Sequence, residues 1–242
     1  MLTVAIPCYK EAENLSFLIP KIKQALDDAG LLAELILMDT QEPTDNTPEI
    51  CRKYEEESDS LVIRYLNREG GNNYGDAIRS IIKNANGEQI VIMDADGSHS
   101  PDDIVRLYNA RTDGDYDIVI GSRYIKGGKT DNPFILILMS YVLNVTYRVF
   151  FRLNVSDVSD SFRCYKTDLI KDLDLKCDNF DIVEELLIVS NVKKHLKIKE
   201  IPITFSKRKY GESKRALVKF IFSYIKTMST LKRIQKEAKR GS

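Results

Sequence analysis

Short apolar runs alternate with amphipathic segments along the first half of the chain, and this alternation constrains the fold more than any other feature. The strand-like runs are residues 2–6, 35–38, 61–65, 89–93 and 117–120. The helix-like segments between them are residues 12–29, 46–57, 73–85 and 101–111. Strands separated by helices form mainly parallel sheets that helices cover on both faces. We therefore expect an α/β fold with a single Rossmann-like sheet.

The second half of the chain has a different pattern. It contains a glycine-bearing loop after residue 121, an apolar helical stretch at 134–153, a polar loop through 157–163, a helix near 180–194 and a strand at 198–205. From Lys214 to Lys239, apolar residues recur at a spacing of three to four, with Lys and Arg on the remaining face. This spacing predicts a basic amphipathic C-terminal helix.

Composition narrows the class of protein. Lys plus Arg equals Asp plus Glu at 36 each, which argues against nucleic acid as a partner. The four cysteines form no metal-binding spacing, so a reducing, cytoplasmic location is the expectation. The start of the chain lacks the pattern of a signal peptide, so we expect no export. The longest uninterrupted apolar run has ten residues, at 134–143, so we expect the chain to lie against a bilayer at most, without crossing it.

The most acidic turn of the predicted sheet is Asp94-Ala95-Asp96. It follows the strand at 89–93 and precedes a strong helix start at Ser100-Pro101-Asp102-Asp103. In open α/β sheets, ligands bind beyond the carboxyl ends of the strands. Two carboxylates placed there suit Mg²⁺ or Mn²⁺, which can bridge to the oxygens of a diphosphate. The alternative is that the two aspartates only cap turns.

Several segments around this turn resemble glycosyltransferase family 2, and most closely its dolichol-phosphate mannose synthase branch, over residues 2 to about 214. The matching segments are residues 6–15 (P-x-Y-N-E-x-x-N-L in the family), 68–77 (R-x-G-K-x-G-x-G-x-A), 121–128 (G-S-R-Y-x-x-G-G), 157–163 (D-x-T-G-S-F-R) and 208–214 (R-x-x-G-x-S-K). The resemblance implies a GT-A domain over 1–214, with a nucleotide-sugar-binding half at 1–120 and an acceptor half at 121–214. Residues 215–242 would be the appended basic helix.

The resemblance also implies site residues on the donor side. The implied contacts to the nucleotide sugar are Pro7, Tyr9, Glu11, Asp39, Gly75, Asp94, Arg208 and Lys214. Asp94 and Asp96 are the implied metal ligands. Glycine turns before helix N-termini suit phosphate oxygens, which is the reason for including Gly75. For Tyr9 and Glu11, packing and helix initiation are the ordinary alternatives.

On the acceptor side, the implied contacts to a lipid phosphate are Arg123, Ser140 and Arg163. The implied catalytic residues are Asp96, Arg123 and Asp157. Asp157 would be the general base for a hydroxyl acceptor, and capping of a loop is its alternative.

Departures from the branch concern both substrates. Gly71 replaces the family's lysine, and only one acid, Asp39, remains of a pair after the second strand, so the base of the donor is left open. Tyr141 stands where the branch has an arginine. Asp160 replaces a glycine or serine, and we expect it to tether Arg163.

The implied reaction is inverting transfer of a hexose, mannose first and glucose second, from a GDP- or UDP-sugar to a polyprenyl phosphate. Two alternatives stay open: a family-2 enzyme acting on a soluble glycan or protein hydroxyl, and a non-catalytic nucleotide-sugar-binding module. The segment at 134–153 and the C-terminal helix fit a protein seated peripherally on the inner face of the cytoplasmic membrane. Core packing and homo-oligomer contact are the alternatives for both.

Overall fold

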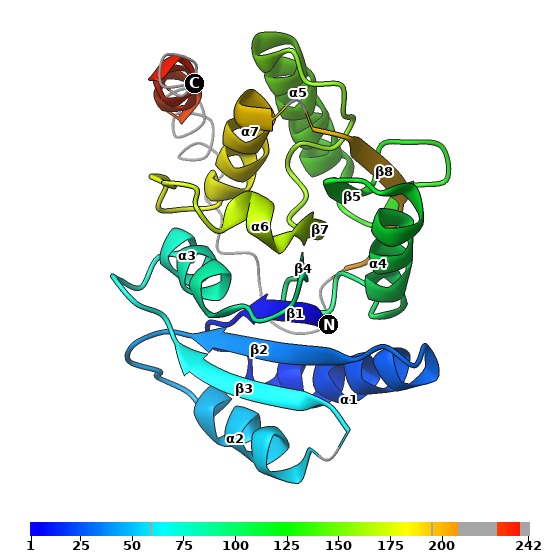
Figure 1. Ribbon diagram of the computed structural model, residues 1–242, viewed down its shortest axis with the longest axis vertical. Helices are drawn as coiled ribbons and strands as arrows, with labels where there is room; N and C mark the ends of the chain where they lie inside the picture. Colours follow the sequence, from blue (N-terminus) through cyan, green and yellow to red (C-terminus); the bar gives the residue numbers. More distant parts are fainter. Residues whose placement is uncertain (59, 195, 208–226, 238–242) are drawn as a thin grey trace.

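The computed structural model describes residues 1–58, 60–194, 196–207 and 227–237. Within them, one seven-stranded sheet has the order β3-β2-β1-β4-β7-β5-β8, and β6 and β9 form a small second sheet. The strands are β1 (Leu2–Pro7), β2 (Ala33–Asp39), β3 (Val62–Asn67), β4 (Gln89–Ile92), β5 (Ile118–Ser122), β6 (Lys129–Thr130), β7 (Arg163–Lys166), β8 (Ile198–Pro202) and β9 (Thr204–Phe205). The predicted mainly parallel α/β sheet is confirmed, and both halves of the chain contribute to it (Figure 1).

Strand β7 was not predicted. It inserts between β4 and β5 and pairs antiparallel with both, whereas the other pairs of the described sheet are parallel. We expected residues 157–163 to form a loop, and the loop instead ends at Arg163, where the strand begins. A strand of four residues that starts with an arginine has too few apolar positions to show a period of two.

Alternate residues of the central strands face two separate hydrophobic clusters. Ile90 and Ile92 pack into one cluster, while Val91 and Met93 pack into the other. The first cluster includes side chains of α3 (Tyr74–Asn84), α5 (Phe134–Phe151), α6 (Thr167–Ile170) and α7 (Ile182–Lys194). The second includes side chains of α1 (Ala12–Asp28), α2 (Thr47–Glu57) and α4 (Asp102–Gly114). Helices therefore cover both faces, as the period of two in a doubly covered sheet requires.

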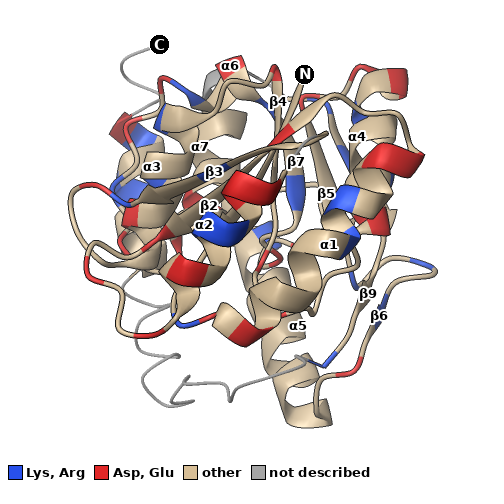
Figure 2. Ribbon diagram, turned by 90° about the horizontal axis from the view of Figure 1, so that it is seen from below, with Lys and Arg blue, Asp and Glu red and all other residues tan. Residues whose placement is uncertain are grey.

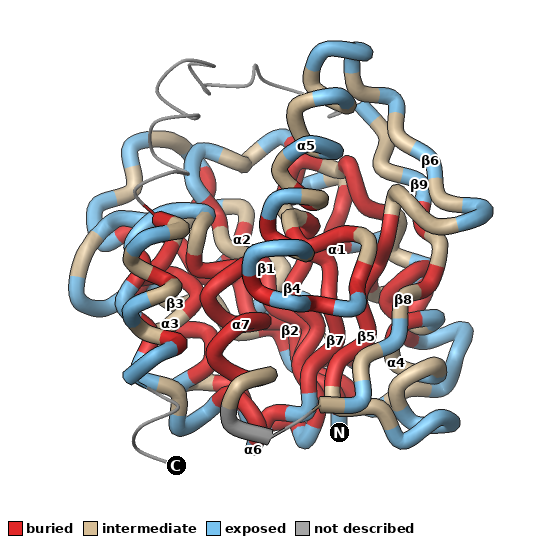
Figure 3. The backbone as a smooth tube through the Cα atoms, turned by 90° about the horizontal axis from the view of Figure 1, so that it is seen from above, coloured by how far each residue is buried: buried red, intermediate tan, exposed pale blue. Residues whose placement is uncertain are grey.

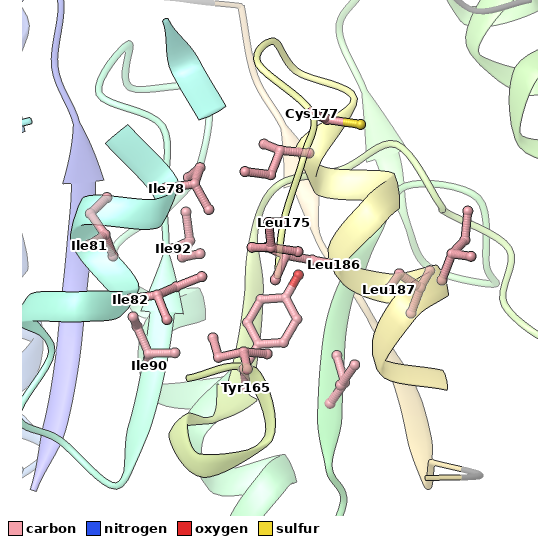
Figure 4. Close-up of a cluster of buried hydrophobic side chains, with 14 of the residues drawn as sticks. Ile78, Ile81, Ile82, Ile90, Ile92, Tyr165, Leu175, Cys177, Leu186 and Leu187 are labelled. Carbon is pink, nitrogen blue, oxygen red and sulfur yellow. The ribbon is translucent and has the colours of Figure 1, made fainter. Parts of the chain in front are cut away.

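The first cluster joins elements that are distant in sequence. Figure 4 shows isoleucines of α3 and β4 facing Tyr165 of β7 and the leucines of α7. The tube in Figure 3 shows that the strands are buried along most of their length.

The C-terminal segment is helical over residues 227–237. Leu231 is fully buried in the first cluster, and Met228 and Ile234 pack against it. The Thr227 hydroxyl donates a hydrogen bond to Asp181 over 2.8 Å. Core packing, one of the alternatives that the sequence left open for this helix, is thus the role of its described part. Its predicted remainder lies outside the described residues.

Helix α5 presents an apolar surface to solvent. Its exposed large side chains are Phe134, Ile135, Leu138, Tyr141, Val142, Val149 and Phe150. In the described part of the chain, this helix alone is long and apolar enough to cross a membrane by length and composition, with a mean hydropathy of 1.7 and 17% of its residues buried. We expected no crossing because the longest uninterrupted apolar run has ten residues; by length and average hydropathy, α5 nevertheless reaches the range of membrane-spanning helices. Figure 2 shows α5 largely without charge, and Figure 3 shows its exposure.

Candidate active site

The sequence-predicted donor residues gather at one edge of the sheet. Strand β1 lies between β2 and β4 and runs parallel to both, with Pro7 beside Met38. The loops that follow these three strands therefore emerge next to one another, carrying residues 8–11, Asp39 and Asp94. This arrangement is the strand-end rim where open α/β sheets bind ligands.

Asp39 is buried at the end of β2, with 1% of its surface exposed. Its carboxylate accepts hydrogen bonds from the Thr40 amide at 2.7 Å and the Tyr65 hydroxyl at 3.1 Å. Burial raises the pKa of Asp39, against the effect of these two donors. The carboxylate is held in a fixed orientation at the rim.

The loop after β1 has an unusual backbone. Lys10 has a φ of +59°, a left-handed conformation that is uncommon for a residue with a side chain. Tyr9 beside it is half exposed, and the Lys10 ammonium lies 5.5 Å from the centre of its ring. The Glu11 carboxylate accepts a hydrogen bond from Asn14, and its amide donates to the Thr47 hydroxyl. The loop thus joins the start of α1 to the start of α2.

Arg68 holds this rim together, and sequence reasoning noted it only as part of a motif. Its buried guanidinium donates to the carbonyl oxygens of Cys8 at 2.6 Å and of Asp39 at 3.2 Å. It also donates to the carbonyls of Asn72 and Asn73, each at 2.9 Å. The Arg68 guanidinium thereby holds together the segments at Cys8, Asp39 and 72–73. Two of these partners are distant in sequence, so the sequence alone did not show this role.

Gly75 has a packing role. Its amide donates to the Asp178 carbonyl at 2.7 Å, and an added Cβ would lie 2.3 Å from the Cys177 carbonyl oxygen. Asn73 and Asp76 form a capping box at the start of α3, so the positive end of this helix faces its own aspartate. Gly75 therefore allows α3 to approach residues 177–178, and its contact to the nucleotide sugar stays a prediction.

The Asp94-Ala95-Asp96 turn follows β4 as predicted, and α4 begins at Asp102. Asp94 accepts a hydrogen bond from the Ser161 hydroxyl at 3.0 Å, and Asp96 accepts one from the Ser98 amide at 3.0 Å. Burial, which is the main cause, raises the pKa of Asp94. A divalent cation would offset the cost of holding these carboxylates ionised.

Two carboxylates fit Mg²⁺ or Mn²⁺, because such ions bind through one or two protein carboxylates together with substrate phosphates. The described residues contain no group of three or more His, Cys, Asp or Glu side chains placed to hold a metal. The remaining coordination positions would therefore belong to a diphosphate and to water.

Arg123 and Asp157 form a buried pair on the other side of this turn. The Arg123 Nε and Nη2 atoms each donate to one Asp157 oxygen at 2.7 Å, and the Arg123 amide donates as well, at 3.0 Å. Asp157 is fully buried, and the Arg123 side chain is 9% exposed. Burial and the neighbouring carboxylates act in opposite directions on the pKa of Arg123, which is raised. Asp157 is therefore engaged as the partner of Arg123, a geometry that does not suit the general base that we expected.

Polar residues of α5 complete this cluster. The Ser140 hydroxyl lies 3.2 Å from the Ser159 hydroxyl, which accepts a hydrogen bond from Arg123. The Asn144 side-chain oxygen accepts from the amides of Val158 and Ser159. Ser159 thus links Ser140 to Arg123, and the contact of both residues to an acceptor phosphate stays a prediction. Asn144 was missed, although a buried amide in an apolar helix is a signal for such a role.

Arg163 does not belong to this cluster. Its side chain is fully buried, and its guanidinium donates to the carbonyls of Val158 and Val183 and to the Tyr165 hydroxyl. The predicted contact to an acceptor phosphate is therefore wrong in this structure, because burial within β7 directs the guanidinium to carbonyl oxygens. Arg208 and Lys214 lie outside the described residues.

Asp160 pairs with residues other than the one we expected. Its Oδ2 lies 3.1 Å from Arg123 Nε, and its Oδ1 lies 3.2 Å from His99 Nε2. The predicted tether to Arg163 is thus replaced by a link between Arg123 and His99, which follows the Asp94-Ala95-Asp96 turn.

Solved structures share this architecture. The chain is similar to glucosyl-3-phosphoglycerate synthase from Mycobacterium tuberculosis in complex with Mn²⁺, uridine-diphosphate and phosphoglyceric acid, with a TM-score of 0.72 and 18% identity over 97% of this chain and 78% of that chain. A complex of the same protein with Mn²⁺ and uridine-diphosphate-glucose gives a TM-score of 0.73 at 17% identity, over 98% and 79% of the two chains. This likeness establishes the fold, which is of the GT-A type.

Sequence relatives lead to a family. The chain is 34% identical to a dolichol-phosphate mannosyltransferase of Pyrococcus furiosus over 98% of its own length and 65% of that relative's length. It is 29% identical to an undecaprenyl-phosphate mannosyltransferase of Micrococcus luteus, over 86% of this chain and 85% of that protein. The family described as Glycosyl transferase family 2 matches residues 3–174. With its GT-A sheet and its strand-end Asp94-Ala95-Asp96 turn, the chain belongs to glycosyl transferase family 2.

Proposed function

We propose that this chain is an inverting glycosyltransferase that moves a hexose from a GDP- or UDP-sugar to a polyprenyl phosphate. Mannose is the first choice, because both sequence relatives are mannosyltransferases that act on a polyprenyl phosphate by name. Glucose is the second. The observation that carries the lipid acceptor is that α5 presents apolar side chains to solvent and also contributes Ser140 and Asn144 to the Arg123 cluster.

The rim of the sheet supports a nucleotide-sugar donor. Tyr9, Glu11 and Asp39 would contact the base and ribose, and Asp94 and Asp96 would hold Mg²⁺ or Mn²⁺. The cation, when bound, stabilises the negative charge that develops on the departing nucleoside diphosphate. Hydrogen bonds from Ser161 and Ser98 orient the carboxylates of Asp94 and Asp96, which supports such a site.

The state of Asp157 favours an acceptor that needs no general base. In the proposed single displacement, an oxygen of the acceptor phosphate attacks the anomeric carbon while the bond from that carbon to the diphosphate oxygen breaks. A phosphate is already anionic at neutral pH, so no proton has to leave the nucleophile. Asp157, buried and bonded to Arg123 through both oxygens, is consistent with this chemistry.

The surface of α5 supports a seat on lipid at the inner face of the cytoplasmic membrane. Phe134, Leu138 and Val142 follow one another at a spacing of four residues and are all exposed, so they share one face of the helix. Flotation with anionic vesicles tests this seat. Leu138→Glu should release the protein from the vesicles, whereas loss of self-association without any vesicle binding would favour an oligomer interface.

A product assay tests the function. The protein is incubated with Mn²⁺, a short polyprenyl phosphate and, in separate reactions, GDP-mannose, GDP-glucose or UDP-glucose, and the lipid is analysed by mass spectrometry. We expect a hexose adduct with one of these donors, and none with Asp96→Ala. The absence of a lipid-linked product with all donors would overturn the lipid acceptor.

One observation favours a soluble hydroxyl acceptor instead. The edge of Arg123 that would bind a phosphate through two nitrogens is occupied by Asp157, and Tyr141 supplies no second cation. Reactions with soluble glycans and peptides in place of the lipid separate these two acceptors. Mn²⁺-dependent hydrolysis of the donor that disappears in Asp96→Ala would exclude a non-catalytic module.

A further inference from the structure

Asp160 occupies a position between the two halves of the site. The resembling branch has glycine or serine here, so the buried carboxylate is a feature of this chain. Asp160 is 2% exposed, and the side chains of its partners His99 and Arg123 are 0% and 9% exposed. A carboxylate buried to this degree is costly unless it is paired. Here Oδ1 faces His99 Nε2 and accepts the Phe162 amide, and Oδ2 faces the Arg123 guanidinium.

On one side, Asp160 faces the ring of His99, which contacts the backbone of Asp94. The Nδ1 atom of His99 accepts a hydrogen bond from the amide of Asp94 over 3.4 Å, so a proton of the neutral ring lies on Nε2, facing Asp160. Phe162 stacks on the ring with centroids 4.5 Å apart, and Phe205 meets it edge-on at 5.2 Å. The ring is thereby held from three directions, and it supports the backbone of the turn.

On the other side, Asp160 adds a second carboxylate to Arg123. Asp157 already bonds Arg123 through both of its oxygens, and Asp160 Oδ2 lies 3.1 Å from the same Nε. Two acidic groups therefore share one guanidinium. An incoming phosphate is attracted by the cation and repelled by both carboxylates, so the second carboxylate lowers its affinity.

The two sides respond to the charge of Asp160 in opposite ways. A negative group near Asp94 and Asp96 attracts a divalent cation to the turn, whereas the same group near Arg123 opposes an anionic acceptor. We propose that Asp160 is a positioning residue that strengthens the cation site through His99 and weakens the hold of Arg123 on an acceptor phosphate. The acceptor half of this inference rests on the function proposed above.

Two variants test the proposal. Asp160→Asn keeps the shape and removes the charge, and Asp160→Ser restores a residue type of the branch, which covers the case in which the asparagine variant does not fold. Mn²⁺ binding is titrated by electron paramagnetic resonance in the presence of GDP and, separately, UDP. We expect the Mn²⁺ dissociation constant to rise about tenfold in both variants, as is typical for loss of a group that orients a metal site. The KM for polyprenyl phosphate should fall about threefold or more.

Glu34 provides a matched control. It is a buried carboxylate with an arginine partner, Arg64 at 2.9 Å, and it bonds Asn86 at the opposite edge of the sheet. Glu34→Gln should lower the thermal stability while leaving Mn²⁺ affinity and acceptor KM unchanged.

The opposite signs separate positioning from a purely structural role. General loosening of the site would weaken Mn²⁺ and acceptor together, and that result would overturn the proposal, as would unchanged Mn²⁺ affinity in both Asp160 variants. If the unmodified protein makes no lipid-linked product, the proposed function fails, and the Mn²⁺ titration still decides whether Asp160 supports the turn.

Discussion

Replacing Arg123 with alanine should destabilise the fold as well as the site. The change leaves Asp157 and Asp160 buried, at 0% and 1% side-chain exposure, without the cation that they share. Removing one partner of a buried ion pair costs about 3–5 kcal/mol, since the remaining charge has no compensation. Domains of this kind are stable by only about 5–15 kcal/mol. A loss of activity in Arg123→Ala would therefore combine unfolding with the loss of the proposed contact to the acceptor.

Urea unfolding followed by circular dichroism measures this cost. For an m-value of about 2 kcal/mol/M, the midpoint of Arg123→Ala should fall by about 1.5–2.5 M. Adding Asp157→Asn should recover part of the loss, because a neutral amide is cheaper to bury unpaired than a carboxylate.

Lys83 is the matched control, because its ion pair with Glu69 lies at the surface, where the two side chains are 65% and 61% exposed. Lys83→Ala should cost no more than about 1 kcal/mol. If Arg123→Ala shifts the midpoint by no more than Lys83→Ala, the buried pair does not stabilise the fold and the reasoning is refuted.

Three further predictions concern other parts of the fold. Burial raises the pKa of Glu34, but hydrogen bonds from Thr3 and Asn86 outweigh it and leave this pKa below its ordinary value. The Glu34 carboxylate therefore stabilises the fold above that ordinary value, and this stabilisation is lost as the pH falls through the lowered pKa. In urea unfolding at pH 3–7, the difference in stability between the unmodified protein and Glu34→Gln should disappear in acid. Leu231→Ala should cost about 2–5 kcal/mol by calorimetry, and a negligible change would mean that the C-terminal helix does not pack on the core. Lys10→Asn should stabilise the protein by about 1 kcal/mol in thermal unfolding, because asparagine tolerates the left-handed backbone better; a loss of stability would contradict this.

Much of the donor side could be predicted from the sequence. The short apolar runs and the helical periods between them were sufficient to predict a parallel sheet covered on both faces. The position of Asp94 and Asp96 at the rim followed, since a turn after a buried parallel strand emerges at the same edge as its neighbours. These inferences depend on signals within about 15 residues of sequence, which is the range over which periodicity and turn chemistry act.

The partners of buried charges were decided by tertiary structure alone. Arg163 and Arg123 both occur in motif segments, yet β7 buries the first among carbonyl oxygens and the second meets Asp157 and Asp160. Gly75 is required by the backbone of residues 177–178, about a hundred residues away. Such contacts depend on which elements pack together, and a guanidinium takes whatever acceptors the packing brings within reach. The sequence therefore determined the architecture and the place of the Asp94-Ala95-Asp96 turn, while the folded structure determined which charged groups pair with one another.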